Sequence, residues 1–484
     1  MKNLRDTSLL KTHCWLAQGW VQASDRTVMN VVDPATRLTL GTVPQLSHDE
    51  IERAISGAVS TQKEWAALTA QKRSTVLRRW FDLIVENVND LARILTAEQG
   101  KPLTEARNEI LYAASFVEWF SEEAKRVYGE TIPAPDDGQR ITVLRQPVGV
   151  CAAITPWNFP AAMITRKVAP ALAAGCAMIV RPSELTPFTA LALAGLAERA
   201  GIPAGILQIV TGDAVEIGAV LTGSSSVRKL SFTGSTEVGR LLMAQCAPTI
   251  KKVSLELGGN APFLVFDDAD IDKAVEGALI SKFRNAGQTC VCTNRFLVQD
   301  DVADEFARKL TEKVGTLKVG PGTEHGVAIG PLINERAVSK VREHVTDAIS
   351  QGAEALVGGG QHELGSTYFS PTVLYGAQPS MRLANEETFG PVAPIFKFST
   401  EAEGIAMAND TIFGLAAYFY TRDHARATRV SEALEFGMVG HNTARISNEV
   451  SPFGGIKQSG VGREGSRHGI DEYLEMKYLC SSIE

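Results

Sequence analysis

The spacing of hydrophobic positions divides the chain into a helical first part followed by two regions in which strands and helices alternate. Residues 48–68 and 71–100 carry apolar side chains three and four positions apart, so the first third of the chain is expected to be helical. Short β-prone runs then alternate with helix-like stretches. The expected strands are residues 148–155, 177–182, 205–212, 228–234 and 251–259. This alternation is typical of a parallel sheet covered by helices on both faces, which binds ligands at the carboxyl ends of its strands.

A second alternating region runs from Ala261 to about residue 440. Two further β-prone segments fit neither sheet. Residues 128–149 predict a hairpin around Asp136, Asp137 and Gly138, and residues 472–480 predict another strand. Because the edges of such strands would be unpaired in a monomer, we expect them to form an oligomerisation arm.

Composition and charge narrow the class of protein. The chain has 484 residues, of which 44% are hydrophobic and 21% charged, as expected of two or three globular domains. The net charge of −7 and the absence of a basic stripe argue against a nucleic-acid partner. No apolar run is long enough for a membrane span, and the first residues do not resemble a secretory signal. The seven cysteines form no disulfide framework and no metal-ligand spacing, so we expect a cytoplasmic protein without a metal.

Three short motifs follow expected strands, and each also has a structural interpretation. Residues 232–239, FTGSTEVG, match neither a dinucleotide fingerprint nor a P-loop, and are either an ordinary glycine turn or a helix start that holds a phosphate. Glu256 lies among apolar residues before a glycine pair, as a general base or as the ion-pair partner of Lys252. Residues 155–160, TPWNFP, form a rigid turn from which Asn158 can donate to an oxyanion.

Together with Cys290 and residues 386–391, EETFGP, these motifs resemble the aldehyde dehydrogenase superfamily in order and spacing. The resemblance covers essentially the whole chain, and the segments LELGGNAP (255–262) and GQTC (287–290) are highly specific. It implies that Cys290 is the nucleophile, that Glu256 is the base, and that Asn158 and the Cys290 backbone N–H form the oxyanion hole. The presence of Glu256 favours hydrolysis of the acyl intermediate over its transfer to coenzyme A.

The resemblance also implies an α/β fold with a Rossmann-type cofactor domain, an α/β catalytic domain and a β-strand oligomerisation arm. The expected protein is a homo-oligomer, either a dimer or a tetramer. We assign the domains as follows: residues 1–125 and 148–256 to the dinucleotide-binding domain, 257–445 to the catalytic domain, and 126–147 and 468–484 to the arm.

Within the superfamily, residues 158–167 and 283–292 resemble succinate-semialdehyde dehydrogenase. The resemblance implies that Arg166 and Arg284 bind the distal carboxylate of the substrate, with Ser447 and Phe453 as further substrate contacts. Guanidinium groups suit this task because they bind carboxylates with two hydrogen bonds, although structural ion pairing is the alternative for each arginine. Arg445 is unusual in the loop before Phe453, and its charge favours wider acceptance, for example of glutarate semialdehyde. A neutral-aldehyde oxidiser and a non-catalytic binding protein are the more distant alternatives.

Cys292 stands two positions after the nucleophile. It resembles the second cysteine of a redox pair in some family members, in which a disulfide stops catalysis. A small buried residue is the alternative interpretation.

The expected cofactor is NAD, with NADP possible. Glu184 is expected to bind the adenosine ribose hydroxyls and to repel a 2′-phosphate, whereas Arg181 favours that phosphate. Glu387 and Phe389 are expected to hold the nicotinamide ribose and ring. The other residues expected to contact the cofactor are Thr155, Pro156, Trp157, Ser183, Gly212, Phe232, Gly234, Ser235, Gly239 and Leu257.

Overall fold

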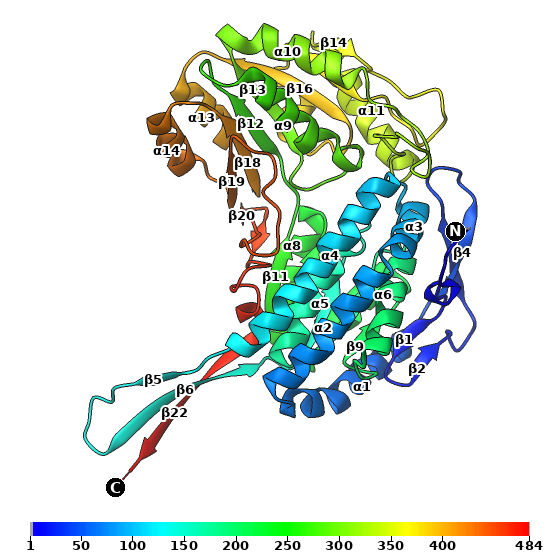
Figure 1. The fold of residues 1–484 in the computed structure, drawn as a ribbon, viewed down its shortest axis with the longest axis vertical. Helices are drawn as coiled ribbons and strands as arrows, with labels where there is room; N and C mark the ends of the chain where they lie inside the picture. The colour runs from blue at the N-terminus through cyan, green and yellow to red at the C-terminus, as the bar shows by residue number, and fades with distance from the viewer. Residues whose placement is uncertain (1–2, 484) are drawn as a thin grey trace.

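The computed structural model describes residues 3–483 and contains two α/β units and a projecting β arm (Figure 1). Each unit has its own hydrophobic core. The first core draws on residues between Leu9 and Leu257 together with Ile470, Tyr473 and Leu474, and the second on residues between Ala261 and Phe453. The predicted α/β fold class is therefore confirmed.

The first unit is built on an eight-stranded sheet in the order β2-β1-β9-β8-β7-β10-β11-β21. Its five central strands are parallel, as the alternating pattern predicts. These strands read as almost uninterrupted apolar runs because helices cover both faces of the sheet. The bounds are β1 (Cys14–Leu16), β2 (Gly19–Val21), β7 (Val150–Ile154), β8 (Ala177–Arg181), β9 (Leu207–Ile209), β10 (Val227–Thr233), β11 (Lys252–Glu256) and β21 (Gly460–Val461).

Several helices of the first unit begin at side-chain caps, among them α2, α7 and α8. Helix α1 starts at a capping box in which Ser47 and Glu50 satisfy each other's backbone amides, and α2 starts at Thr69. Helix α2 packs on α4, α5 and α6, so two helical layers lie on this side of the sheet. The bounds are α1 (His48–Ala67), α2 (Ala70–Glu86), α3 (Val88–Gln99), α4 (Leu103–Glu123), α5 (Ala162–Ala174), α6 (Pro187–Ala200), α7 (Ala214–Gly223) and α8 (Thr236–Cys246).

The expectation that the first third is helical is wrong for its first 47 residues. They form β1, β2 and the hairpin of β3 (Val28–Val32) and β4 (Thr39–Pro44). These strands are short, and β2 and β3 are largely exposed, so they carry little apolar periodicity. Pairing of β1 with β9 adds β1 and β2 to the edge of the first sheet, whereas β3 and β4 pair only with each other.

The second unit is built on a seven-stranded sheet in the order β14-β15-β16-β13-β12-β18-β19. All neighbours except the β14–β15 pair are parallel, which confirms the second alternating region. The strands are β12 (Ala261–Val265), β13 (Thr293–Gln299), β14 (Glu354–Val357), β15 (Thr372–Tyr375), β16 (Val392–Phe398), β18 (Ala416–Tyr420) and β19 (Met438–His441). The helices are α9 (Ile271–Phe283), α10 (Asp300–Val314), α11 (Glu335–Ser350), α12 (Arg382–Asn385), α13 (Glu401–Asn409) and α14 (His424–Ala433).

The predicted hairpin and the final strand pair with each other and extend away from both units (Figure 1). Strand β6 (Gln139–Pro147) lies between β5 (Glu130–Ile132) and β22 (Leu474–Ser482) in an antiparallel three-stranded sheet. Large apolar side chains on this sheet are exposed, among them Ile132, Leu144, Met476 and Tyr478. A minor two-stranded sheet joins β17 (Phe413–Gly414) to β20 (Ile456–Lys457).

No helix within residues 3–483 is both long enough and apolar enough to cross a membrane.

Candidate active site

The predicted site residues gather where the carboxyl ends of the first sheet's strands face the second unit. Residues 155–158 follow β7, Gly234 and Ser235 follow β10, and Glu256 ends β11. Cys290 lies in the loop between the 3₁₀ turn η4 (Arg284–Gly287) and β13 of the second unit. Loops at the carboxyl ends of a parallel sheet place side chains from distant segments side by side.

The loop that carries Cys290 has an unusual backbone. Asn285 and Ala286 adopt positive φ angles of 52° and 54°, which cost energy for residues with a Cβ atom. Gly287 follows at 75°, where an added Cβ would lie 2.1 Å from the Gly390 carbonyl oxygen. Asn285 is held in place because its side-chain amide donates to the carbonyl oxygens of Asn158 and Gln288. The bent backbone therefore positions the Cys290 thiol from a rigid turn.

The surroundings of Cys290 in this structure favour the protonated thiol. Burial, followed by the negative charges of Glu387 and Glu256, raises the pKa of Cys290 to about 12. Arg166 and Arg284 lower this pKa, so both guanidinium groups lie close enough to act on the thiol. A thiolate is the nucleophilic form, and added positive charge nearby would favour it.

Asn158 is fixed by three hydrogen bonds. Its side-chain Nδ2 donates to the main-chain carbonyl oxygen of Gln288 at 3.0 Å. Its main-chain carbonyl oxygen accepts from Lys101 Nζ at 2.7 Å and from Asn285 Nδ2 at 3.0 Å. A side-chain amide has two N–H groups, so one donor of Asn158 remains for a ligand. Lys101 is a positioning residue that the sequence motifs did not reveal, because it lies 57 positions from Asn158.

Glu256 is a buried carboxyl group with one oxygen, Oε2, that has no hydrogen-bond partner among the described residues. Burial, followed by the charge of Glu464, raises the pKa of Glu256 well above its ordinary value, against the opposite effects of Arg166 and Lys167. No ion pair joins Glu256 to Lys252, whose Nζ instead lies 3.3 Å from Glu475. The alternative interpretation of Glu256 as the partner of Lys252 is therefore excluded.

Two cavities lie at this place. The larger site cavity has a volume of about 670 Å³ and is lined by Cys290 and Asn158. Seven predicted cofactor residues also line it: Pro156, Trp157, Gly234, Ser235, Leu257, Glu387 and Phe389. The smaller site cavity, of about 380 Å³, is lined by Arg284 and Ser447 and shares Phe159 with the larger one. A third cavity, of about 770 Å³, lies at the base of the arm and contains none of the predicted site residues.

Glu387 and Phe389 are held at the wall of the larger site cavity. Glu387 accepts a hydrogen bond from the Gly259 amide at 3.1 Å, and burial raises its pKa to about 7. The Phe389 ring meets the Trp157 ring edge to face at 5.6 Å. Lys340, which the sequence motifs did not reveal, donates to the Glu387 carbonyl oxygen at 2.5 Å.

The remaining predicted cofactor residues lie beneath or beside this cavity. Phe232 lies under Gly234, and Gly239 lies against Leu257, so a Cβ at either glycine would collide with the neighbouring side chain. Arg181 Nη2 forms an ion pair with Glu184 Oε2 at 2.8 Å and contacts the Gly212 carbonyl oxygen. Ser183 is buried in the same turn, with its hydroxyl 3.3 Å from the Leu185 amide.

Unpartnered polar atoms at these strand ends fit a bound dinucleotide. The buried hydroxyl groups of Thr155 and Thr233 and the Nε of Arg181 have no hydrogen-bond partner among the described residues. Ser235 caps helix α8, whose free amide groups and dipole favour a phosphate. Buried polar groups are rarely left unpaired, so these atoms fit the hydroxyl and phosphate oxygens of such a ligand.

Only two of the four predicted substrate residues line a site cavity. Arg284 and Ser447 line the smaller site cavity, whereas Arg166 and Phe453 line neither site cavity. Arg166 is 1% exposed, and its Nε forms an ion pair with Glu464 Oε2 at 2.7 Å. Its guanidinium lies 4.0 Å from the centre of the Phe453 ring, and its Nη2 has no hydrogen-bond partner among residues 3–483. Glu464 therefore offsets part of the charge of Arg166, because Lys167 shares the same carboxylate.

Cys292 is buried, and its thiol contacts the Lys282 carbonyl oxygen at 3.4 Å. Both Cys290 and Cys292 are free thiols. A disulfide between them requires Cys292 to leave this contact, so the redox pair stays a prediction. Peroxide inactivation that persists unchanged in Cys292→Ala would contradict it.

The fold and this site define a class of oxidoreductase in which a cavity for a dinucleotide lies beside a nucleophilic cysteine. A model of the aldehyde dehydrogenase family matches residues 20–479, and the chain belongs to this family.

Relatives match over nearly the full length of the chain. A glutarate-semialdehyde dehydrogenase of Pseudomonas putida is 60% identical over 99% of this chain and 100% of its own length. A succinate-semialdehyde dehydrogenase [NADP(+)] of Escherichia coli is 59% identical over 99% of this chain and 100% of its own length. The crystal structure of an aldehyde dehydrogenase from Brucella melitensis biovar abortus has a TM-score of 0.99 and 66% identity, with both chains covered completely.

Proposed function

We propose that the protein oxidises succinate semialdehyde to succinate with NAD(P), through a thiohemiacetal and a thioester on Cys290. The observation that carries this proposal is Arg284, whose guanidinium lines the cavity beside Cys290 without an ion-pair partner among the described residues. The names of two full-length relatives support a carboxylated aldehyde, since one acts on succinate semialdehyde and the other on glutarate semialdehyde. Oxidation of glutarate semialdehyde or another ω-carboxylated aldehyde is the second candidate.

In the first step the Cys290 thiol releases its proton to solvent, and Sγ, now the thiolate, attacks the aldehyde carbon and forms a C–S bond as the C=O double bond opens. The carbonyl oxygen becomes an oxyanion, which the free N–H of Asn158 Nδ2 and the Cys290 backbone amide stabilise. An oxidised nicotinamide, when bound, would supply the hydride acceptor for the thiohemiacetal carbon, which then becomes the thioester carbon. Residues lining the larger site cavity, among them Trp157, Glu387 and Phe389, would hold that group.

In the second step Glu256 removes a proton from a water molecule that attacks the thioester carbon. The C–S bond breaks, the carboxylic acid leaves, and Cys290 is released as a thiolate. Burial of Glu256 suits this role, because a carboxylate with a raised pKa is a stronger base than an exposed one. Its unpartnered Oε2 is the oxygen available to the water.

Arg284→Ala is expected to raise KM for succinate semialdehyde on the order of 10- to 100-fold, because a charge-assisted hydrogen bond to the carboxylate is lost. KM for a neutral aldehyde of the same length should change much less. Initial rates of NADH formation with both aldehydes measure the difference. Arg308→Ala, which removes an exposed arginine from α10, is the matched control. Equal effects of Arg284→Ala on both aldehydes would contradict the proposed function.

We propose further that NAD is preferred to NADP. Glu184 compensates the charge of Arg181 in a close ion pair, so this arginine is not free for a 2′-phosphate. Both cofactors occur among related proteins, since the Escherichia coli relative carries NADP(+) in its name and a betaine aldehyde dehydrogenase from Staphylococcus aureus was solved in complex with NAD+.

Glu184→Ser is expected to raise kcat/KM for NADP on the order of tenfold, because it frees Arg181 and removes a like charge. Paired assays with NAD and NADP measure this shift, and Glu432→Ser on the exposed face of α14 is the control. If Glu184→Ser discriminates between NAD and NADP as the unmodified enzyme does, Glu184 does not set the preference for NAD.

The domain ranges given above and the oligomeric state also remain proposals. In the arm, β5 and β22 are the edge strands of a three-stranded sheet, and large apolar side chains on the arm are exposed. We infer that a second copy of the chain covers this sheet in a dimer or tetramer. Light scattering that gives the mass of one chain would contradict this assembly.

A further inference from the structure

Arg445 lies in the loop that follows β19 and lines the smaller site cavity together with Arg284 and Ser447. Its side chain is exposed and has no ion pair or side-chain hydrogen bond among residues 3–483. Its backbone amide donates to Thr443 Oγ1 at 3.2 Å. The guanidinium is therefore available to a ligand in the cavity.

The side chains that line the smaller site cavity carry more positive than negative charge. The cations are Lys101, Arg284 and Arg445, and the carboxyl groups are Glu105 and Glu109. Lys101 and Glu109 form a buried ion pair at 2.5 Å. Burial raises the pKa of Glu105, which favours its neutral form and leaves Arg284 without a strong counter-charge. Arg284 and Arg445 together therefore give this cavity its excess of positive charge.

Arg284 and Arg445 reach the same cavity from different segments: Arg284 begins the turn η4, and Arg445 lies in the loop after β19. Arg284 is among the main charges that shift the pKa of Cys290, so its guanidinium acts on the nucleophile. Each methylene added to a substrate whose aldehyde carbon meets Cys290 moves its distal carboxylate farther from the sulfur, so a longer substrate can use a second cation on the same cavity wall.

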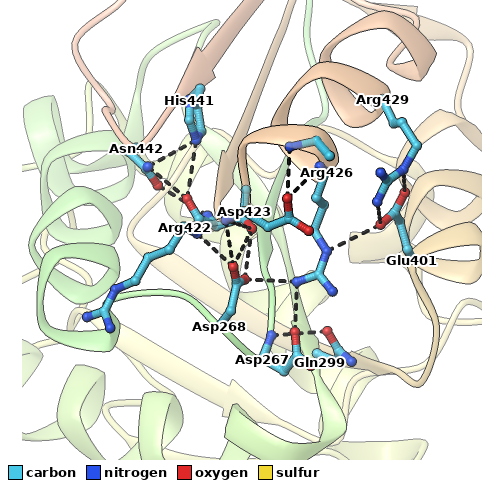
Figure 2. A network of polar contacts seen from close by, with 12 residues as sticks. Asp267, Asp268, Gln299, Glu401, Arg422, Asp423, Arg426, Arg429, His441 and Asn442 are labelled. Carbon is cyan, nitrogen blue, oxygen red and sulfur yellow. Dashed lines mark hydrogen bonds and ion pairs between the residues drawn. The ribbon is translucent and has the colours of Figure 1, made fainter.

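The loop is anchored where it leaves the sheet, as Figure 2 shows for His441 and Asn442. Asn442 exchanges two side-chain hydrogen bonds with the backbone of Thr421, at 2.9 and 3.2 Å. The His441 ring stacks on Phe419 at 4.8 Å. Thr421 in turn donates to Asp268, which pairs with Arg426. This network fixes the start of the loop, close in sequence to Arg445. The Arg445 side chain therefore extends from an anchored backbone segment.

We propose that Arg445 is a specificity-determining residue that, with Arg284, binds the distal carboxylate of ω-carboxylated aldehydes longer than four carbons. Two guanidinium groups that share one carboxylate offer more donors than a single arginine and extend the site outward. This inference rests on the proposed function, because it assumes that the smaller site cavity receives the substrate's distal end. Under this inference Arg284 and Arg445 together bind the distal carboxylate of the five-carbon glutarate semialdehyde. That of the four-carbon succinate semialdehyde is bound mainly by Arg284 and Ser447.

The test compares kcat/KM for glutarate semialdehyde, succinate semialdehyde and pentanal in the full-length enzyme and three variants. Arg445→Gln should lower the value for glutarate semialdehyde on the order of tenfold, mostly through KM, and lower that for succinate semialdehyde less. Arg445→Lys keeps the charge and should recover part of the loss. Arg308→Gln, which removes an exposed charge from α10, should alter none of the ratios.

An equal loss with both acids, or a loss with pentanal as large as with glutarate semialdehyde, would overturn the role of Arg445. Its failure is distinguishable from failure of the proposed function. If the unmodified enzyme does not prefer either acid to pentanal, the proposed function fails. If it does prefer them, and Arg445→Gln leaves the ratio of the two acids unchanged, only the present inference fails.

Discussion

Cys290→Ala is expected to lower kcat for aldehyde oxidation by roughly 10⁴-fold or more, as removal of the group that forms the covalent intermediate does in other enzymes. An aldehyde carries no leaving group, so the hydride is released only after a tetrahedral adduct has formed on the sulfur. Alanine leaves no atom that can form it. The measurement is the steady-state rate of NADH formation at saturating aldehyde, with cofactor binding followed separately to show that the larger site cavity is intact.

Cys480→Ala is the matched control, because Cys480 is an exposed thiol on the arm. It should keep the rate of the unmodified enzyme. The opposite pattern, with activity retained in Cys290→Ala, would remove the covalent mechanism and leave the cavities without a nucleophile.

Glu256→Gln is expected to lower steady-state kcat on the order of 10²- to 10⁴-fold, because the general base of the hydrolytic step is lost. The chemistry before hydrolysis keeps Cys290 and Asn158, so a burst of reduced cofactor close to one per active site should remain. Rapid mixing with absorbance at the NADH band measures the burst and the slow phase in one experiment. Glu354→Gln, on the exposed strand β14, is the control and should keep both phases unchanged.

The pH dependence gives the same variant a second readout. Only the ionised form of Glu256 accepts a proton, and its pKa is raised, so hydrolysis in the unmodified enzyme should accelerate as pH rises through that raised pKa. Glu256→Gln should lack this rise. Full turnover in Glu256→Gln, or an unchanged pH profile, would assign the base to another group.

The ion pairs around Glu256 show why the sequence did not reveal the whole site. Glu464 lies 208 residues after Glu256 in the chain, yet its carboxylate contacts both Arg166 and Lys167, and its charge raises the pKa of Glu256. Its local sequence, GREGS, carries no distinctive spacing. Buried charges find partners through the packing of distant segments, and a linear pattern does not record that packing.

The sequence by itself determined the parallel core of both sheets and the candidate nucleophile. The core strands are buried on both faces and therefore appear as continuous apolar runs between turn residues, from β7 through β11 and again from β12 through β19. The Cys290 loop and the LELGGNAP segment could be recognised from the sequence, because the residues that form the tight turn and the strand end are adjacent in the chain. The arm was also predictable, because its apolar alternation has no place in either sheet.

Only the tertiary structure decided the rest. Strand β1 joins the first sheet by pairing with β9, which lies nearly 200 residues away in the chain and which its own composition does not specify. The pairing of Arg166 with Glu464 and the meeting of Arg284 with Arg445 in one cavity join segments separated by 298 and 161 positions. Which arginine is neutralised and which is free depends on the carboxylates that packing places beside it, and electrostatic contacts of this kind have no sequence period.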